Sequence, residues 1–245
     1  MAIRFPPPYT PPAQVQAQMR AQGYAALAPQ AVAALAQADT GELLTFAPYW
    51  NDLPPDTYLK DGGRYRYRRH SCFVAEGDHL QQAPHRAHWQ SLDYNALHGG
   101  MQRWFQPISA ALLAQPSWQR LLLGIGGICT ALSGVARWHV EAHQFRIDTS
   151  DGIGRPTPEG AHRDGVDYVA VILIARHAIK GGETRVFEAD GPQGQRFTLS
   201  EPWSALLLDD ARMIHETTPI QPAAEYGYRD TLVLTYRRGA FQGED

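Results

Sequence analysis

The chain is poor in cysteine and has little net charge, and each shortage argues against a class of protein. Cys72 and Cys129 are the two cysteines, far apart and without a CxxC pattern. This argues against a disulfide framework and a cysteine zinc site, so we expect two structural thiols in a reducing compartment. A formal net charge of −3 gives no basic surface of the kind that binds nucleic acid.

Long apolar runs are also missing. The longest uncharged stretch, 121–136, is too short to span a membrane and is interrupted by glycine and serine. Residues 1–12 are proline-rich and lack the apolar segment of a secretory signal. We therefore expect a soluble, cytoplasmic protein with no nucleic-acid or membrane partner; the sequence leaves the oligomeric state open.

What is present is a globular composition, with 44% apolar and 19% charged residues among 245. This length suits one domain of the larger kind. We expect a proline-rich arm over 1–12, supporting helical and strand elements over 13–134, and a β-rich core over 135–238. In the first half, apolar spacing predicts two helices within 13–38, broken around Gly23 and Pro29.

A second apolar stripe predicts helix between His88 and Leu123, with Ala96 and Leu97 among its members and the glycines of 124–127 ending it. Before it, residues 65–74 read as a strand. The arginines of 64–69 alternate along that strand, and we interpret them as its solvated face.

From residue 135 onward, short β-rich runs alternate with glycine and proline turns. Many short strands without βαβ alternation predict an α+β, mainly β fold with a sandwich or barrel core. The predicted strands cover 137–148, 167–175, 184–188, 196–199, 205–208, 213–217 and 231–236.

His162 and Asp164 stand two residues apart. In an extended segment this spacing places both side chains on one face, where an imidazole and a carboxylate can reach one metal ion. His215 follows in a later predicted strand. Two histidines and one carboxylate form the facial triad suited to Fe(II), which leaves coordination positions open. An HxD pair alone is weak evidence, because a turn-capping histidine would look the same.

A cationic strand supplies the third element. Arg229 opens the last apolar strand, and alternation places Thr231 on the same face. An arginine fork with a nearby hydroxyl suits one end of a dicarboxylate. The alternative is an ordinary surface arginine at a strand start, and Arg212 or Arg237 could also serve as the anion partner.

Together these residues resemble the 2-oxoglutarate/Fe(II) oxygenase superfamily, whose signature is HxD, a distal His and Arg-x-Ser/Thr. Gly181-Gly182-Glu183-Thr184 resembles the turn and strand that lie between the metal-binding elements in many members. The segments 162–167, 214–219 and 228–232 are similar to a bacterial branch, the 2OG-Fe dioxygenases related to BsmA and to L-isoleucine dioxygenase.

The resemblance implies a double-stranded β-helix (jelly-roll) core flanked by N-terminal helices. It implies Fe(II) on His162, Asp164 and His215, and 2-oxoglutarate as cosubstrate, held by Arg229 and Thr231. It further implies consumption of O2, release of succinate and CO2, and hydroxylation of a small molecule, by this branch a free L-amino acid. The alternatives are a peptidyl hydroxylase, a non-catalytic metal-binding jelly roll and a zinc hydrolase.

A free amino acid needs an anion partner and an ammonium acceptor. Gln144 and Arg146 share a strand face, and Glu159 lies just before His162, so we consider these three as substrate residues. Other histidines appear ordinary. His139-Val140-Glu141-Ala142-His143 lacks the glutamate that HExxH requires directly after its first histidine, so we interpret it as polar strand residues. His85 and His88 have no matching ligand pair, and we expect them on the surface.

Overall fold

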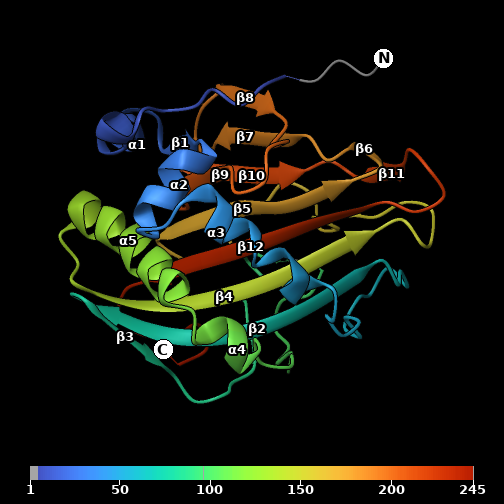
Figure 1. The fold of residues 1–245 in the computed structure, drawn as a ribbon, viewed down its shortest axis with the longest axis horizontal. Coiled ribbons are helices and arrows are strands. Elements are labelled where there is room, and N and C mark those ends of the chain that lie inside the picture. Colours follow the sequence, from blue (N-terminus) through green and yellow to red (C-terminus); the bar gives the residue numbers. More distant parts are fainter. Residues whose placement is uncertain (1–4, 96, 245) are drawn as a thin grey trace.

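The computed structural model describes residues 5–95 and 97–244 and is built around a large antiparallel sheet (Figure 1). The strands are β1 (Tyr24–Leu27), β2 (Arg66–Glu76), β3 (His79–Gln82), β4 (Arg137–Asp148), β5 (Tyr168–His177), β6 (Ile179–Gly181), β7 (Thr184–Glu188), β8 (Gly194–Phe197), β9 (Ala205–Asp209), β10 (Met213–Thr217), β11 (Ile220–Pro222) and β12 (Tyr228–Arg237). The main sheet has the order β1-β9-β5-β12-β4-β2-β3, so it draws strands from both halves of the chain.

Two smaller sheets complete the β core. One has the order β10-β7-β8 and the other pairs β11 with β6. A compact apolar cluster, which includes Val186 and Met213 from the small sheet and Leu206 and Leu208 from β9, joins the three-stranded sheet to the main one. The predicted α+β, mainly β class is confirmed, and the predicted strands at 137–148, 184–188 and 213–217 have the observed bounds.

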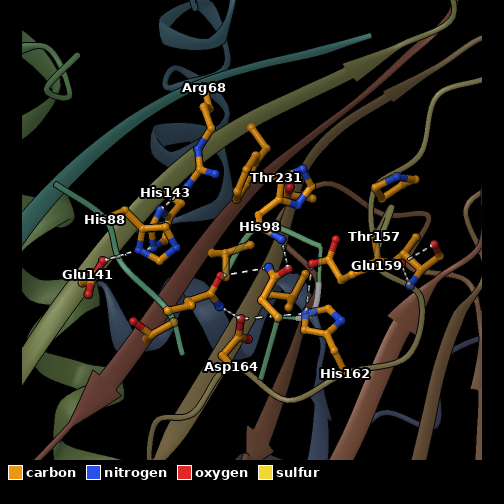
Figure 2. Close-up of a pocket in the computed structure, with 18 of the residues that line it drawn as sticks. Arg68, His88, His98, Glu141, His143, Thr157, Glu159, His162, Asp164 and Thr231 are labelled. Atoms are coloured by element: carbon orange, nitrogen blue, oxygen red, sulfur yellow. Dashed lines mark hydrogen bonds and ion pairs between the residues drawn. The ribbon is translucent and has the colours of Figure 1, made fainter. Parts of the chain in front are cut away.

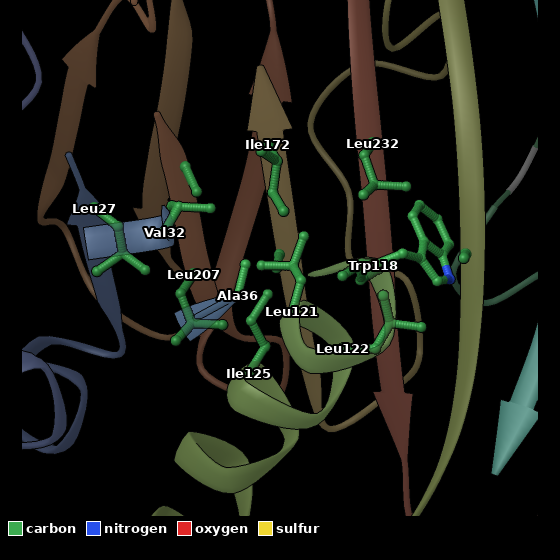
Figure 3. Packing of buried hydrophobic residues seen from close by; sticks show 14 of the residues in the cluster. Leu27, Val32, Ala36, Trp118, Leu121, Leu122, Ile125, Ile172, Leu207 and Leu232 are labelled. Atoms are coloured by element: carbon green, nitrogen blue, oxygen red, sulfur yellow. The ribbon is translucent and has the colours of Figure 1, made fainter. Parts of the chain in front are cut away.

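Helices cover one face of the main sheet (Figure 1). They are η1 (Pro12–Gln14), α1 (Val15–Gln22), α2 (Pro29–Leu35), α3 (Thr40–Leu44), η2 (Ala47–Trp50), α4 (Ala110–Leu113) and α5 (Pro116–Ser133). Figure 3 shows Leu121, Leu122 and Ile125 of α5 packed among Leu232 and Leu207 of the sheet. No helix in the described part of the chain is long and apolar enough to cross a membrane.

Strand β12 shows how the sequence separates two faces. Leu232 and Leu234 are fully buried in the core under the helices, whereas Thr231, Val233 and Thr235 line a pocket on the opposite face. Side chains alternate along a strand, so one amphipathic strand serves both the core and the pocket. The predicted alternation of this strand is confirmed.

The two helices predicted within 13–38 are confirmed as α1 and α2, and the break between them contains strand β1, which pairs with β9. The helix predicted between His88 and Leu123 needs correction. It starts too early: residues 88–109 form turns and irregular structure where described, and Ala96 lies outside the described residues. The glycines of 124–127 lie inside α5. A Cβ at Gly124 would approach the Leu35 carbonyl oxygen to 2.5 Å, so this glycine permits close packing of α5 on α2.

Candidate metal and cosubstrate site

One pocket collects the predicted metal and cosubstrate residues. It lies on the sheet face opposite the helices, where β4 and β12 supply its floor and the segments around 88–103 and 156–166 supply its walls. His162, Asp164, His215, Arg229 and Thr231 all line it. The sequence placed these residues in separate segments, and the fold brings them to one cavity.

The backbone brings the two predicted histidine ligands together. His162 and His215 form an antiparallel bridge, in which each amide N–H donates to the other carbonyl oxygen at 3.0 and 2.9 Å. This bridge joins the loop before β5 to the middle of β10. One ligand atom from each of His162, Asp164 and His215 lies within 4.8 Å of the others, an arrangement that suits one metal ion.

The ring nitrogens are oriented for ligation. Nδ1 of His162 is 2.9 Å from the Gly160 carbonyl oxygen, which can only accept, so in the neutral ring Nε2 carries the lone pair and faces Asp164. Nε2 of each histidine is 3.8 Å from a different Asp164 oxygen, a spacing too long for a hydrogen bond. Burial, with His162 next to it, lowers the pKa of His215 well below its usual value, which keeps it neutral for a metal.

Asp210 holds the Asp164 loop from behind. Its carboxylate accepts the backbone N–H groups of Asp164, Gly165 and Val166 at 2.9, 2.8 and 3.1 Å. Gly165 has φ +79°, and a Cβ there would meet the Tyr94 ring, so both conformation and space favour glycine. Asp210 was not predicted from the sequence, where its only signal was an Asp-Asp pair at the end of a strand.

Gln90 fixes the Asp164 side chain from the opposite side. Its Oε1 accepts from Asn95 Nδ2 at 3.0 Å and from Arg103 Nη2 at 2.8 Å. These two donors force the amide Nε2 toward Asp164, where it donates to Oδ1 at 3.2 Å. Asp164 is therefore held in two ways: Asp210 accepts from its backbone N–H, and Gln90 donates to its side-chain oxygen Oδ1.

Arg229 is a buried cation with donors to spare. Its side chain lines the pocket, the residue is 3% exposed, and Nε and Nη2 have no hydrogen-bond partner among residues 5–95 and 97–244. Burial, reinforced by Arg176, lowers the pKa of Arg229 to about 10, so the guanidinium stays charged at neutral pH. A buried cation with unpaired donors is costly unless an anion binds there.

The two alternative arginines are engaged elsewhere. Arg212 donates to the carbonyl oxygens of Met19, Arg20 and Ala21 at the end of α1. Arg237 donates to the Ala240 carbonyl oxygen at 2.6 Å and does not line the pocket. Position therefore favours Arg229 over both.

The donor set fits Fe(II) and 2-oxoglutarate. Two imidazoles and one carboxylate leave half of an octahedron open. The unpaired donors of Arg229, with the Thr231 hydroxyl on the same strand face, suit a carboxylate in the same cavity.

Of the three predicted substrate residues, only Glu159 lines the pocket. Glu159 lines the pocket, and its Oε1 is 3.6 Å from His162 Nε2. Gln144 and Arg146 do not line it, contrary to the prediction, because they lie on the opposite face of β4 from His143 and Phe145. Arg146 is instead paired with Asp230 through two contacts of 2.7 Å.

Several residues predicted to be surface or simple strand residues form much of the pocket wall. Arg66 and Arg68 are 5% and 3% exposed and line the pocket. The predicted alternation of arginines along this strand is therefore correct, but the face that carries Arg66 and Arg68 points into the pocket and not into solvent. His88 is buried, whereas His85 is exposed as predicted. Glu141 and His143 also point into the pocket. The Glu-x-His spacing on a strand was the available signal, since it places both side chains on one face.

Comparisons with known proteins agree with this geometry. A family model described as 2OG-Fe dioxygenase matches residues 47–235. The crystal structure of a bsmA homolog from Methylobium petroleophilum PM1 is 52% identical, with a TM-score of 0.91 over 97% of each chain. No curated protein sequence matches the chain.

Two more distant structures support the fold. IDO from Bacillus thuringiensis is 17% identical, with a TM-score of 0.75 over 99% of each chain. The Fe(II)/(alpha)ketoglutarate-dependent dioxygenase TqaL is 18% identical, with a TM-score of 0.72 over 95% of this chain and 88% of its own. These similarities indicate the jelly-roll core expected from the sequence. With the family match covering most of its length, the chain belongs to the 2OG-Fe dioxygenases, oxidoreductases that use Fe(II) and 2-oxoglutarate.

Proposed function

We propose that this dioxygenase hydroxylates a small molecule, a free L-amino acid, with release of succinate and CO2. One observation supports the mechanism above all others. A buried arginine with two unpaired donor atoms lies in the same cavity as the His162–Asp164–His215 triad. A protein that merely bound metal would have no use for that cation, which argues against a non-catalytic jelly roll and against a zinc hydrolase.

In this proposal His162, Asp164 and His215 hold Fe(II), while Arg229 and Thr231 bind the distal carboxylate of 2-oxoglutarate. Bound iron and 2-oxoglutarate together supply the oxidising power. The protein contributes fixed ligand geometry through the Asp210 and Gln90 contacts, and it orients the cosubstrate through Arg229. The buried wall of β4 and β12 limits access of water.

The amino-acid assignment is supported by the other charges in the pocket. Arg68 and Arg103 are 3% and 2% exposed and supply donors for a carboxylate, and the pocket holds two carboxylates, Glu141 and Glu159, as alternative acceptors for an ammonium group. A free amino acid carries both charges, whereas a residue inside a peptide carries neither at its backbone. A reducing, cytoplasmic setting belongs to the proposal, because both cysteines are free and buried.

The test is a screen of the twenty free L-amino acids for stimulated succinate release, dependent on Fe(II) and 2-oxoglutarate. We expect stimulation by one or a few of them and a product that has gained one oxygen atom. No stimulation by any amino acid, together with stimulation by a peptide, would favour the peptidyl hydroxylase alternative and leave the dioxygenase mechanism intact.

A further inference from the structure

Three side chains of a second histidine and carboxylate group, those of His88, Glu141 and His143, line the far wall of the same pocket (Figure 2). We define the histidine cluster as His70, His88, Glu141 and His143, all buried, with one potential ligand atom each within 4.8 Å of the others. His70 comes from β2, Glu141 and His143 come from β4, and His88 comes from the segment between β3 and α4. By residue type alone this group suits a second metal ion.

The distances within the histidine cluster are those of hydrogen bonds. His70 Nε2 and His88 Nδ1 lie 2.7 and 2.8 Å from the same Glu141 oxygen, Oε2. Ligands around one metal ion at about 2.0–2.2 Å would stand roughly 3 Å or more apart. Protons therefore fit between these atoms, and each histidine donates N–H to Glu141.

The tautomer of His143 gives a stronger reason. Arg68 Nη2 lies 2.7 Å from His143 Nδ1, and a guanidinium can only donate, so Nδ1 accepts and Nε2 carries the hydrogen. A metal ion on Nε2 would require a proton on Nδ1, which would then oppose the Arg68 donor. Arg68 has little room to move, because its guanidinium lies 3.9 Å and 4.3 Å from the ring centroids of Phe105 and Phe145.

This hydrogen-bond pattern leaves two acceptors at the pocket. With two N–H groups on Oε2, Glu141 keeps Oε1, and His88 keeps the lone pair of Nε2. Neither atom has a hydrogen-bond partner among the described residues, and neither is sealed from the cavity by protein atoms. Both are acceptors, so a ligand here must bring donors.

The charge of the histidine cluster points the same way. Burial opposes ionisation of Glu141, but His88 and His70 outweigh it and hold the pKa of this carboxyl well below its usual range. Burial lowers the pKa of His88 to about 3 and that of His143 well below its usual value, so the imidazoles are neutral. The cluster therefore carries one negative charge on a buried carboxylate, which a bound cation would stabilise.

We infer that Glu141 and His88 form a subsite for a protonated amine of the substrate, and that the histidine cluster is not a second metal centre. The inference rests on the proposed function, since it assigns one of the two charges of an amino acid to named residues. Arg68, beside this subsite, is in place for the carboxylate.

Metal stoichiometry tests the negative half of the inference. Metal-free protein is titrated with Co(II), separated from excess metal and analysed for bound cobalt. We expect one ion per chain, lost in Asp164→Ala and retained in Glu141→Gln. A second ion that disappears in Glu141→Gln would overturn the inference.

Amine discrimination tests the positive half. Each amino acid that stimulates succinate release is compared with its 2-hydroxy acid, which lacks the ammonium group. In Glu141→Gln we expect kcat/KM for the amino acid to fall at least about tenfold, as for a lost charged hydrogen bond, with a smaller fall for the hydroxy acid and an unchanged KM for 2-oxoglutarate.

Glu159→Gln is the matched control, because Glu159 is the other carboxylate of the pocket considered for the amine. It should retain the preference for the amine; loss of preference in this variant and not in Glu141→Gln would overturn the inference. If Glu141→Gln does not fold, His88→Leu removes the second acceptor and should cost about fivefold, as for a neutral hydrogen bond. An unchanged preference in His88→Leu would then count against the subsite.

Failure of the substrate class is distinguishable from failure of the subsite. If no amino acid stimulates the wild-type protein, isobutylammonium and isobutanol are used as ligands instead. Their binding is followed by the change in the visible absorption spectrum of the cobalt-loaded protein. We expect isobutylammonium to bind at least tenfold more weakly to Glu141→Gln than to wild type, and isobutanol to bind both equally. Equal affinity of isobutylammonium for both proteins would overturn the subsite.

Discussion

The metal triad and the histidine cluster use the same kinds of side chain, histidine and carboxylate, yet they suit different ligands. In the triad, His162 turns one nitrogen to a carbonyl oxygen and so presents a lone pair to Asp164. In the cluster, His143 accepts a hydrogen bond from Arg68 and so presents an N–H. The partner of the outward nitrogen decides whether the inward nitrogen can bind a metal ion. Residue type alone cannot distinguish the two.

The two groups also differ in their support. The triad joins a loop to the small sheet, and its loop depends on Asp210. Three members of the histidine cluster, His70, Glu141 and His143, stand on adjacent strands of the main sheet, where His70 and His143 are register partners. Only His88 comes from a loop, so most of the cluster is held by the sheet.

Removal of triad ligands should have the largest effect. We expect His162→Ala, Asp164→Ala and His215→Ala each to abolish turnover and leave the fold intact, because each removes a ligand from a three-ligand site. Metal content, succinate release and circular dichroism measure these outcomes. Zinc, cobalt or nickel should occupy the wild-type site without activity. Full activity of iron-loaded His215→Ala would show that the triad is wrongly assigned.

Substitution of Arg229, the residue proposed to bind 2-oxoglutarate, should have the second largest effect. Arg229→Ala should weaken 2-oxoglutarate binding at least about tenfold and iron binding far less, since it removes charged hydrogen bonds to a carboxylate. Anaerobic titration of the iron-loaded protein with 2-oxoglutarate measures both. Arg237→Ala is the control on the same strand, and a loss in that variant alone would transfer the role to Arg237.

The fold class, and the residues that meet at the candidate triad, could be predicted from the sequence because both depend on local spacing. HxD, the strand histidine and the alternation of β12 are visible without tertiary information. Gln90 and Asp210 were not predictable, because their roles arise from side chains that meet across long sequence separations. The arginines of β2 were assigned to solvent because alternation identifies two faces and not which one faces water.

Loop support should matter less than the ligands themselves. In Asp210→Asn, one carboxylate oxygen becomes an amide N–H that opposes the backbone donors of the Asp164 loop. We expect affinity for Fe(II) to fall about tenfold, within the range for residues that orient ligands. Asp209→Asn, at the neighbouring last residue of β9, should leave the affinity unchanged. Equal affinities in an anaerobic titration would mean that the loop holds its shape without Asp210.

The smallest effect concerns protons in the histidine cluster. The pKa of His88 is lowered to about 3 by burial, from about 6.5 in an unfolded chain. Between these values the unfolded chain binds more protons, so the free energy of unfolding is highest above pH 6.5 and falls as the pH drops through this window. From pH 7 to pH 5, His88 alone should cost about 2 kcal/mol.

Denaturant unfolding at both pH values, with chelator present, measures this loss. His88→Gln should reduce the loss of unfolding free energy between pH 7 and pH 5 by that amount. His79→Gln should not, because the side chain of His79 is 89% exposed. If wild type and His88→Gln differ in slope only when metal is added, then metal release from the cluster, and not protonation of a neutral imidazole, governs the cluster. That result would erase the difference between the two groups. An equal difference in slope with and without chelator is what a cluster held by hydrogen bonds requires.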